Sequence, residues 1–360
     1  MARKFAFNTL YIIDILGEND LYLPKEIEIN TNRGCEISLN NNTASQLFKS
    51  VSSLNLPIPV YFVKIHNRPM LHSFFTDLEV VVREKSLIPI LHFECHGSSE
   101  DGVFLPTIKK YVSWSEINEF LLKINKLINN NILVAIAGCQ SYKLIDSIEY
   151  SKGSPFGCYV GANSVTHDGI IKRFKDFYRH IFLYNDFEAA CEILGNDFSV
   201  IFSYDICMRE VLLPIVLNYF GKDRKDLVEY TVNQMIANGQ QGPISYIRKI
   251  AKSRLKNLGK YYEVSGKRFL HGNKPLPFSE LERIALTLKA SLNDEAKFNE
   301  ELKAAIQFKN NYLSAKEINN HYFIDYNFKE KIEIICFYQN LKVSMMDNTC
   351  FFLIKMAGKV

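Results

Sequence analysis

Two short segments of the sequence place a reactive side chain directly after a run of apolar residues. Residues 91–97 (LHFECHG) end in His96 and Gly97, and residues 135–141 (AIAGCQS) centre on Cys139. In open α/β sheets, sites form at the edge where the carboxyl ends of the strands lie. A cysteine nucleophile needs a base within hydrogen-bond reach, and histidine can supply it. If the two strands are neighbours, we expect Cys139 and His96 to form a catalytic dyad.

Backbone N–H groups beside the same residues would complete the chemistry. A tetrahedral intermediate carries negative charge on the former carbonyl oxygen, and aligned N–H donors stabilise that charge. Gly97 has no side chain to obstruct its N–H, and the N–H of Cys139 lies at the neighbouring strand end. We therefore expect Gly97 and Cys139 to form an oxyanion hole.

The elements around this pair alternate between strand-like and helix-like patterns through the first 210 residues. Apolar runs predict strands over 5–15, 60–65, 88–94, 132–137 and 156–162, and helical spacing predicts helices over 40–54, 72–85, 113–128 and around 174–182. Ser113 and Glu116 form a capping-box pattern at one helix start. Alternating strands and helices predict an α/β domain whose mostly parallel sheet is covered on both faces.

The pattern changes after about residue 210. Helical spacing continues over 211–258 and 279–312, and the last forty residues contain strand-like runs at 322–326, 332–338 and 350–354. We therefore predict two domains. Residues 1–210 form the α/β domain, and residues 211–360 form an accessory α+β region for regulation or for binding a partner or target.

Composition excludes several classes of protein. The chain has 360 residues, of which 47% are hydrophobic, so it is not a disordered chain. The net charge of +4 is too small to indicate nucleic-acid binding by itself. No apolar run approaches the roughly 20 residues of a membrane span, and the N-terminus does not read as a signal peptide. The eight cysteines form no Cys-x-x-Cys pair, so we expect reduced thiols in a cytoplasmic protein without a metal site.

The order of these motifs resembles the caspase-like cysteine peptidases, and within them the CHAT group, which includes relatives of separase. In that group a strand ends in His-Gly, a helix then begins with Trp, and a second strand ends in a small residue plus Cys. The corresponding residues here are His96-Gly97, Trp114 and Gly138-Cys139. The resemblance spans about residues 85–195 and continues through 157–163, 165–168, 174–178 and 186–193.

The resemblance implies a three-layer α/β/α sandwich and a cysteine endopeptidase that needs no cofactor. His96 would be the general base and Cys139 the nucleophile that forms a thioester with a protein substrate. Relatives such as separase accept arginine in an acidic pocket, and Asp168, or less favourably Glu94, would supply that carboxylate here. Caspases carry Gln-Ala before the cysteine, whereas this chain has Ala137-Gly138. We therefore expect cleavage after a basic residue, in a regulated antiviral-defence or cell-death pathway.

Other readings remain open from the sequence. The chain could be a catalytically silent caspase-like scaffold or a ligand-sensing module that binds a partner. Residues 244–274 contain nine basic residues and one acid, Glu263. Such a run is typical of a solvated face, but it also suits a nucleic acid, an acidic partner or an anionic membrane surface, or an activating ligand. No third member of a catalytic triad is identifiable from spacing.

Overall fold

The computed structural model describes residues 6–17, 20, 42–162, 169–195, 198–208, 224–237 and 240–283. Asp168, most of the helix predicted over 279–312 and the strands predicted after residue 320 lie outside these residues. The chain divides into two compact units. The first comprises Met1–Ile148 and Ser154–Ser203, and the second comprises Glu149–Gly153 and Tyr204–Val360.

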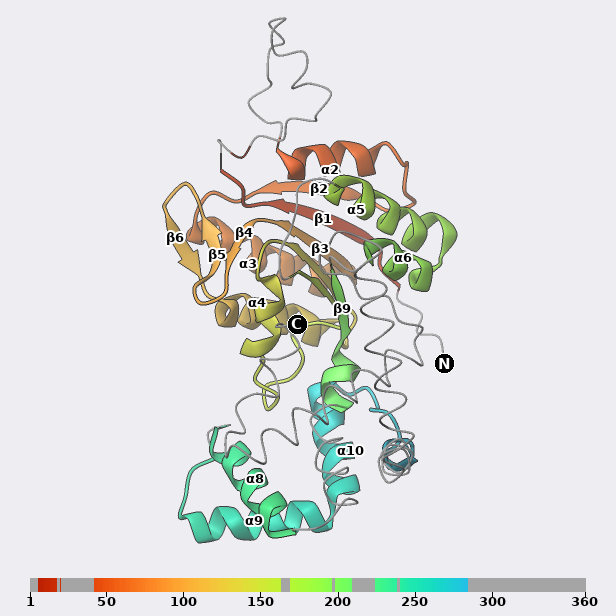
Figure 1. Cartoon of the computed structure of the whole chain (residues 1–360). Helices are drawn as coiled ribbons and strands as arrows, with labels where there is room; N and C mark the ends of the chain where they lie inside the picture. Colours follow the sequence, from red (N-terminus) through yellow and green to blue (C-terminus); the bar gives the residue numbers. More distant parts are fainter. Residues whose placement is uncertain are drawn as a thin grey trace, which may run out of the picture. The chain divides into compact units, whose positions relative to one another are not determined.

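A six-stranded sheet forms the centre of the first unit (Figure 1). Its order is β2 (Val60–Lys64), β1 (Thr9–Asp14), β3 (Pro89–Glu94), β7 (Leu133–Ala137), β8 (Cys158–Gly161) and β9 (Ser199–Phe202). All neighbouring pairs are parallel except β8 and β9. The predicted α/β class with a mostly parallel sheet is therefore confirmed. β3 and β7 are buried along their whole length, as expected for strands covered on both faces.

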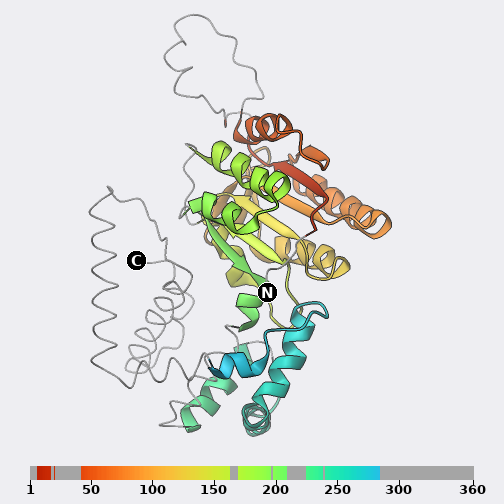
Figure 2. The ribbon, with the colours of Figure 1, turned by 90° about the vertical axis from the view of Figure 1, so that its right-hand side faces the viewer.

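Helices cover both faces of this sheet (Figures 1 and 2). One layer contains α2 (Thr43–Ser52), α5 (Ile170–Arg179), the π-helical turn η3 (His180–Tyr184) and α6 (Phe187–Leu194), and the other contains α3 (Arg68–Lys85) and α4 (Trp114–Leu127). The Ser113 side chain accepts a hydrogen bond from the N–H of Glu116, as predicted. The Glu116 carboxylate binds Arg68 and His72 of α3, so it joins the two helices.

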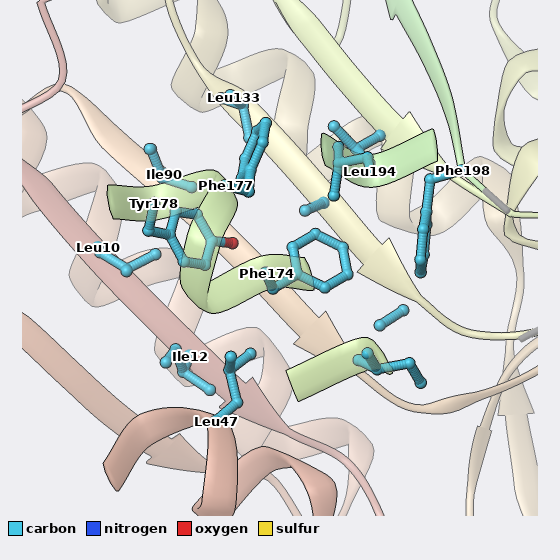
Figure 3. Packing of buried hydrophobic residues seen from close by; sticks show 14 of the residues in the cluster. Leu10, Ile12, Leu47, Ile90, Leu133, Phe174, Phe177, Tyr178, Leu194 and Phe198 are labelled. Atoms are coloured by element: carbon cyan, nitrogen blue, oxygen red, sulfur yellow. The ribbon is translucent and has the colours of Figure 1, made fainter. Parts of the chain in front are cut away.

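The larger apolar core lies between the sheet and the α2–α5–α6 layer (Figure 3). Aromatic rings of α5 fill its centre, and Phe174 and Phe177 are fully buried there. On the opposite face, Phe75 of α3 stacks on Phe120 of α4 with ring centroids 4.7 Å apart and also packs against Phe93 of β3. Packing on both faces holds β3 and β7 rigidly, and these are the strands that lead to the predicted dyad.

A second, three-stranded antiparallel sheet was not predicted. It contains β4 (His96–Ser98), β5 (Gly102–Leu105) and β6 (Lys110–Val112) in that order. Because β3 ends at Glu94 and β4 begins at His96, the chain passes from one sheet to the other at Cys95. His96 therefore belongs to the small sheet, and strand alternation along β3 does not extend to it.

The described part of the second unit includes the helices α8 (Arg224–Ala237), α9 (Ile244–Lys256) and α10 (Leu258–Phe269). Buried residues of α8 and α9 make a small apolar cluster. The ring of Tyr150, from the segment after the 3₁₀ helix η2 (Ser141–Ser147), stacks on Phe269 of α10 at 4.3 Å. Among the described helices of both units, none combines the length and apolar character that crossing a membrane would require.

Candidate active site

The two strands that precede the predicted dyad are direct neighbours. β3 pairs with β7 in parallel, and Glu94 lies opposite Ala137 at the last pair of the register. Both strands therefore end at the same level of the carboxyl edge. His96 comes two residues after the end of β3, and Cys139 comes two residues after the end of β7. The neighbouring strands that the dyad requires are thus present.

Glycines let the two strand ends approach each other closely. A Cβ atom on Gly97 would overlap the carbonyl oxygen of Cys139, and one on Gly138 would lie 2.9 Å from both the carbonyl oxygen and the Sγ of Cys95. Backbones at this separation leave no room for a side chain. Gly97 therefore lies against Cys139, and His96 is the residue directly before this contact.

The turn that carries Cys139 is held from beneath. Gln140 has a positive φ of 60°, and the next residue, Ser141, is fully buried. The Ser141 hydroxyl donates to the carbonyl oxygen of Ile136 at 3.0 Å and accepts from the N–H of Ala162 at 2.8 Å. The Tyr159 hydroxyl donates to the Ser141 carbonyl oxygen at 2.6 Å. These bonds fix the backbone after β7, while the Cys139 side chain itself is exposed.

His96 is held by a carboxylate that sequence reasoning missed. Its Nε2 atom lies 3.0 Å from Oδ2 of Asp20, and the same oxygen accepts the N–H of Gly17 at 2.6 Å. A carboxylate only accepts, so Nε2 carries the hydrogen and Nδ1 is left as the basic nitrogen. Asp20 follows β1, which ends at the same edge of the sheet. The spacing of the sequence does not link Asp20 to His96, because loops of different length after β1 could bring different residues to the histidine.

β4 is anchored by the single tryptophan. The Nε1–H of Trp114 donates to the carbonyl oxygen of Ser98 at 2.9 Å. Its ring also borders Gly97, since a Cβ there would lie 3.3 Å from Cζ2 of Trp114. Trp114 thus does more than start α4, because it packs against the strand that carries His96.

Two neighbouring cysteines differ sharply in their surroundings. Cys95 is buried, and burial raises the pKa of its thiol far above the ordinary value, with further increases from Glu94 and Cys139. A protonated, buried thiol is a poor nucleophile. Cys139 is exposed at the end of β7. Of these two, only Cys139 is placed to react with a substrate.

Glu94 faces the interior. Its side chain is 2% exposed. Oε2 accepts the Thr43 hydroxyl at 2.8 Å, and Oε1 accepts Nε2–H of His92 at 3.0 Å. The Nδ1 atom of His92 lies 2.8 Å from the hydroxyl of Tyr178. A substrate guanidinium would have to displace Thr43 or His92 to reach this carboxylate. Glu94 and His96 also lie on different strands, because β3 ends at Glu94 and His96 begins β4.

A second buried carboxylate, Asp14, closes the end of β1. It is 2% exposed and lies opposite Glu94 in the register. One oxygen accepts the N–H of Leu16, and the other binds Lys64 Nζ at 2.8 Å and Asn42 Nδ2 at 2.9 Å. A buried charge with this many partners is a structural link. It positions the chain that continues from β1 to Asp20.

Within the described ranges, no group of three or more His, Cys, Asp or Glu side chains is arranged to hold a metal ion. No protein-family model and no curated protein matches this chain. The chemistry of the site therefore has to be inferred from its own geometry.

Proposed function

We propose that this protein is a cysteine endopeptidase of the caspase-like type, with Cys139 as nucleophile and His96 as general base. One observation carries the proposal. The backbone of Gly97 lies against that of Cys139 at the carboxyl edge of neighbouring parallel strands, so the residue that follows His96 touches the residue that carries the exposed thiol. The six-stranded sheet with helices on both faces supports the caspase-like assignment of the fold.

The proposed reaction proceeds through a thioester. Nδ1 of His96 takes the proton of the Cys139 thiol, and the thiolate attacks the scissile carbonyl carbon. The N–H groups of Gly97 and Cys139 stabilise the resulting oxyanion. His96 then gives its proton to the leaving amine as the C–N bond breaks. Water, deprotonated by His96, attacks the thioester and releases the new carboxyl group and the thiol.

Asp20 is a positioning residue in this scheme. By accepting Nε2–H, it selects the tautomer in which Nδ1 is basic and orients the ring. It also stabilises the imidazolium that forms when Cys139 is deprotonated. Both partners are partly open, with 44% of the His96 side chain and 29% of the Asp20 side chain exposed, so a substrate can reach the pair.

We further propose that cleavage follows a basic residue and serves a regulated defence or cell-death pathway. A carboxylate in the pocket would form a bidentate pair with a substrate arginine. Because Glu94 is engaged in the interior, we propose Asp168 as the residue that supplies this carboxylate. A peptide panel that varies only the residue before the cut tests this preference. Preferred cleavage after acidic or apolar residues would contradict it.

Labelling with acyloxymethyl-ketone peptide probes tests the dyad. We expect Cys139→Ala to abolish labelling at the Cys139 peptide, and His96→Ala to slow it by roughly a hundredfold or more. Cys191→Ala, in α6, is the matched control and should label normally. Labelling that survives Cys139→Ala would contradict the assignment. Complete absence of labelling, also in a lysate of stressed source cells, would favour the catalytically silent scaffold.

A further inference from the structure

The outer side of α9 carries a row of lysines. Lys249, Lys252 and Lys256 are exposed and lie three and four residues apart. At 3.6 residues per turn they fall within an arc of about 60°, on the side of the helix opposite the buried Ile247 and Ala251. We call these three residues the α9 lysine row.

The other cations of this helix have partners inside the unit. Arg248 binds Glu229 of α8 through two hydrogen bonds of 2.6 and 2.8 Å, and this pair joins the two helices. Arg254 lies over the ring of Tyr261 at 4.8 Å. The lysines of the row form no ion pair within 4.0 Å of any residue that the structure describes, and Lys252 contributes only at longer range to the lowered pKa of Glu229, whose main partner is Arg248. On α9, therefore, the two arginines have partners within the unit, whereas the three lysines of the row face outward.

The positive charge continues along the chain. On α10, Lys260 and Lys267 are exposed on the side opposite the buried Tyr262 and Phe269. Across Ile244–Phe269 there are eight basic residues and a single acid, Glu263. This local excess differs from the protein's nearly balanced charge. Clustered cations on one surface attract polyanions and speed their association.

The surface suits a nucleic acid better than a membrane. A helix that lies in a membrane interface needs a broad exposed apolar face. Here Ile247 and Ala251 of α9 and Tyr262 and Phe269 of α10 are buried, and the exposed aliphatic residues Ile244 and Val264 stand singly, one on each helix. The row spans about 10.5 Å at 1.5 Å per residue, which is long enough for its three ammonium groups to meet successive phosphates of one nucleic-acid strand. Tyr246, 54% exposed and three residues before Lys249, offers a ring on which a base can stack.

We propose that the α9 lysine row binds the phosphate backbone of single-stranded nucleic acid, with Tyr246 stacking on a base and no base sequence selected. The charge of the row supplies affinity, and the aromatic ring favours a single strand over a duplex, whose bases are not available for stacking. This property is independent of the proposed peptidase activity, because its residues lie outside the candidate active site.

Fluorescence anisotropy of the full chain with labelled oligouridylate and oligothymidylate, over a series of salt concentrations, tests the proposal. We expect the triple variant K249Q/K252Q/K256Q to bind roughly tenfold more weakly and to lose about two units from the slope of log affinity against log salt, at about 0.7 per phosphate contact. The matched control, K109Q/K123Q/K126Q, removes three exposed lysines of the first unit and leaves affinity and slope unchanged. Circular dichroism establishes that both variants fold.

A second pair of variants tests the stacking. Tyr246→Ala should weaken binding of single strands by roughly tenfold without altering the salt slope, and Tyr246→Phe should retain the affinity. The proposal is overturned if the native chain binds neither oligonucleotide, or if both triple variants lose affinity equally. It is also overturned if the native chain prefers phosphatidylserine vesicles or duplex DNA to the single strands.

Discussion

Nε2 of His96 lies 3.0 Å from Oδ2 of Asp20, and the two residues come from separate parts of the first unit, the loop after β1 and the start of β4. Gly17 donates its N–H to the same oxygen, so the carboxylate is itself held in place. A base oriented by a third group in this way is the arrangement on which activated nucleophiles depend.

Asp20→Asn should lower kcat by at least roughly tenfold and leave KM nearly unchanged, because the amide can donate to His96 and stabilise the wrong tautomer. ¹⁵N NMR of the His96 ring should show the loss of the Nε2–H form. Asp101→Asn, at the exposed position directly before β5, is the control and should retain full activity. An unchanged tautomer together with unchanged kcat would remove Asp20 from the site.

Gly97→Ala should abolish the proposed peptidase activity, since the added methyl group overlaps the Cys139 carbonyl oxygen and forces the two strand ends apart. Overpacking of this kind destabilises a protein by about 1–3 kcal/mol. Probe labelling of Cys139 and urea unfolding measure the two effects. The nearby exposed Ser99→Ala should affect neither. Normal labelling of Gly97→Ala would show that the close approach is not needed.

Tyr178→Phe should destabilise the first unit by about 1–3 kcal/mol, because it leaves Nδ1 of the buried His92 without its partner. Tyr184→Phe makes the same chemical change at a 60% exposed position and should stay within about 0.5 kcal/mol of the native chain. Urea unfolding at neutral pH compares the two variants. Equal stability of the two would mean that the buried hydrogen bond contributes nothing.

Stability should fall at alkaline pH in part through the same tyrosine. Burial, with a contribution from Glu94, raises the pKa of Tyr178 well above its ordinary value of 10.0. The folded state therefore holds this proton more tightly than the unfolded state does. The resulting stabilisation is full below pH 10.0 and is lost as the pH rises from there toward the folded-state pKa. Unfolding free energies measured across this range should decline less steeply in Tyr178→Phe than in the native chain.

Tyr150 should protect the segment that follows η2 from proteolysis. Its ring stacks on Phe269, and its hydroxyl lies 3.2 Å from the Cys207 sulfur. Losing an aromatic pair worth about 0.5–1.5 kcal/mol should speed tryptic cleavage after Lys152 in Tyr150→Ala by up to roughly tenfold. Tyr150→Phe keeps the stacking and should be cut at nearly the native rate. Equal rates for both variants would contradict this role of the ring.

Local patterns in the sequence determined the elements and the reactive residues. The uninterrupted apolar runs at 88–94 and 132–137 predicted two buried strands, and both are found there as β3 and β7. Helical spacing and the Ser113 cap predicted α4. These features depend on neighbours within a few residues, so the sequence displays them directly. The position of His96 and Cys139 just beyond apolar strands was readable in the same way.

Only the tertiary structure decided how those elements meet. In the folded unit β3 lies beside β7, and His96 belongs to a second sheet. The Glu94 side chain lies in the interior, and Asp20 contacts His96. The strands of the second sheet have three or four residues, too few to show a period. Pairing between distant segments is selected by packing and backbone hydrogen bonding across the whole unit. Spacing along the chain does not record that selection, because loops of different length can bring the same two residues together.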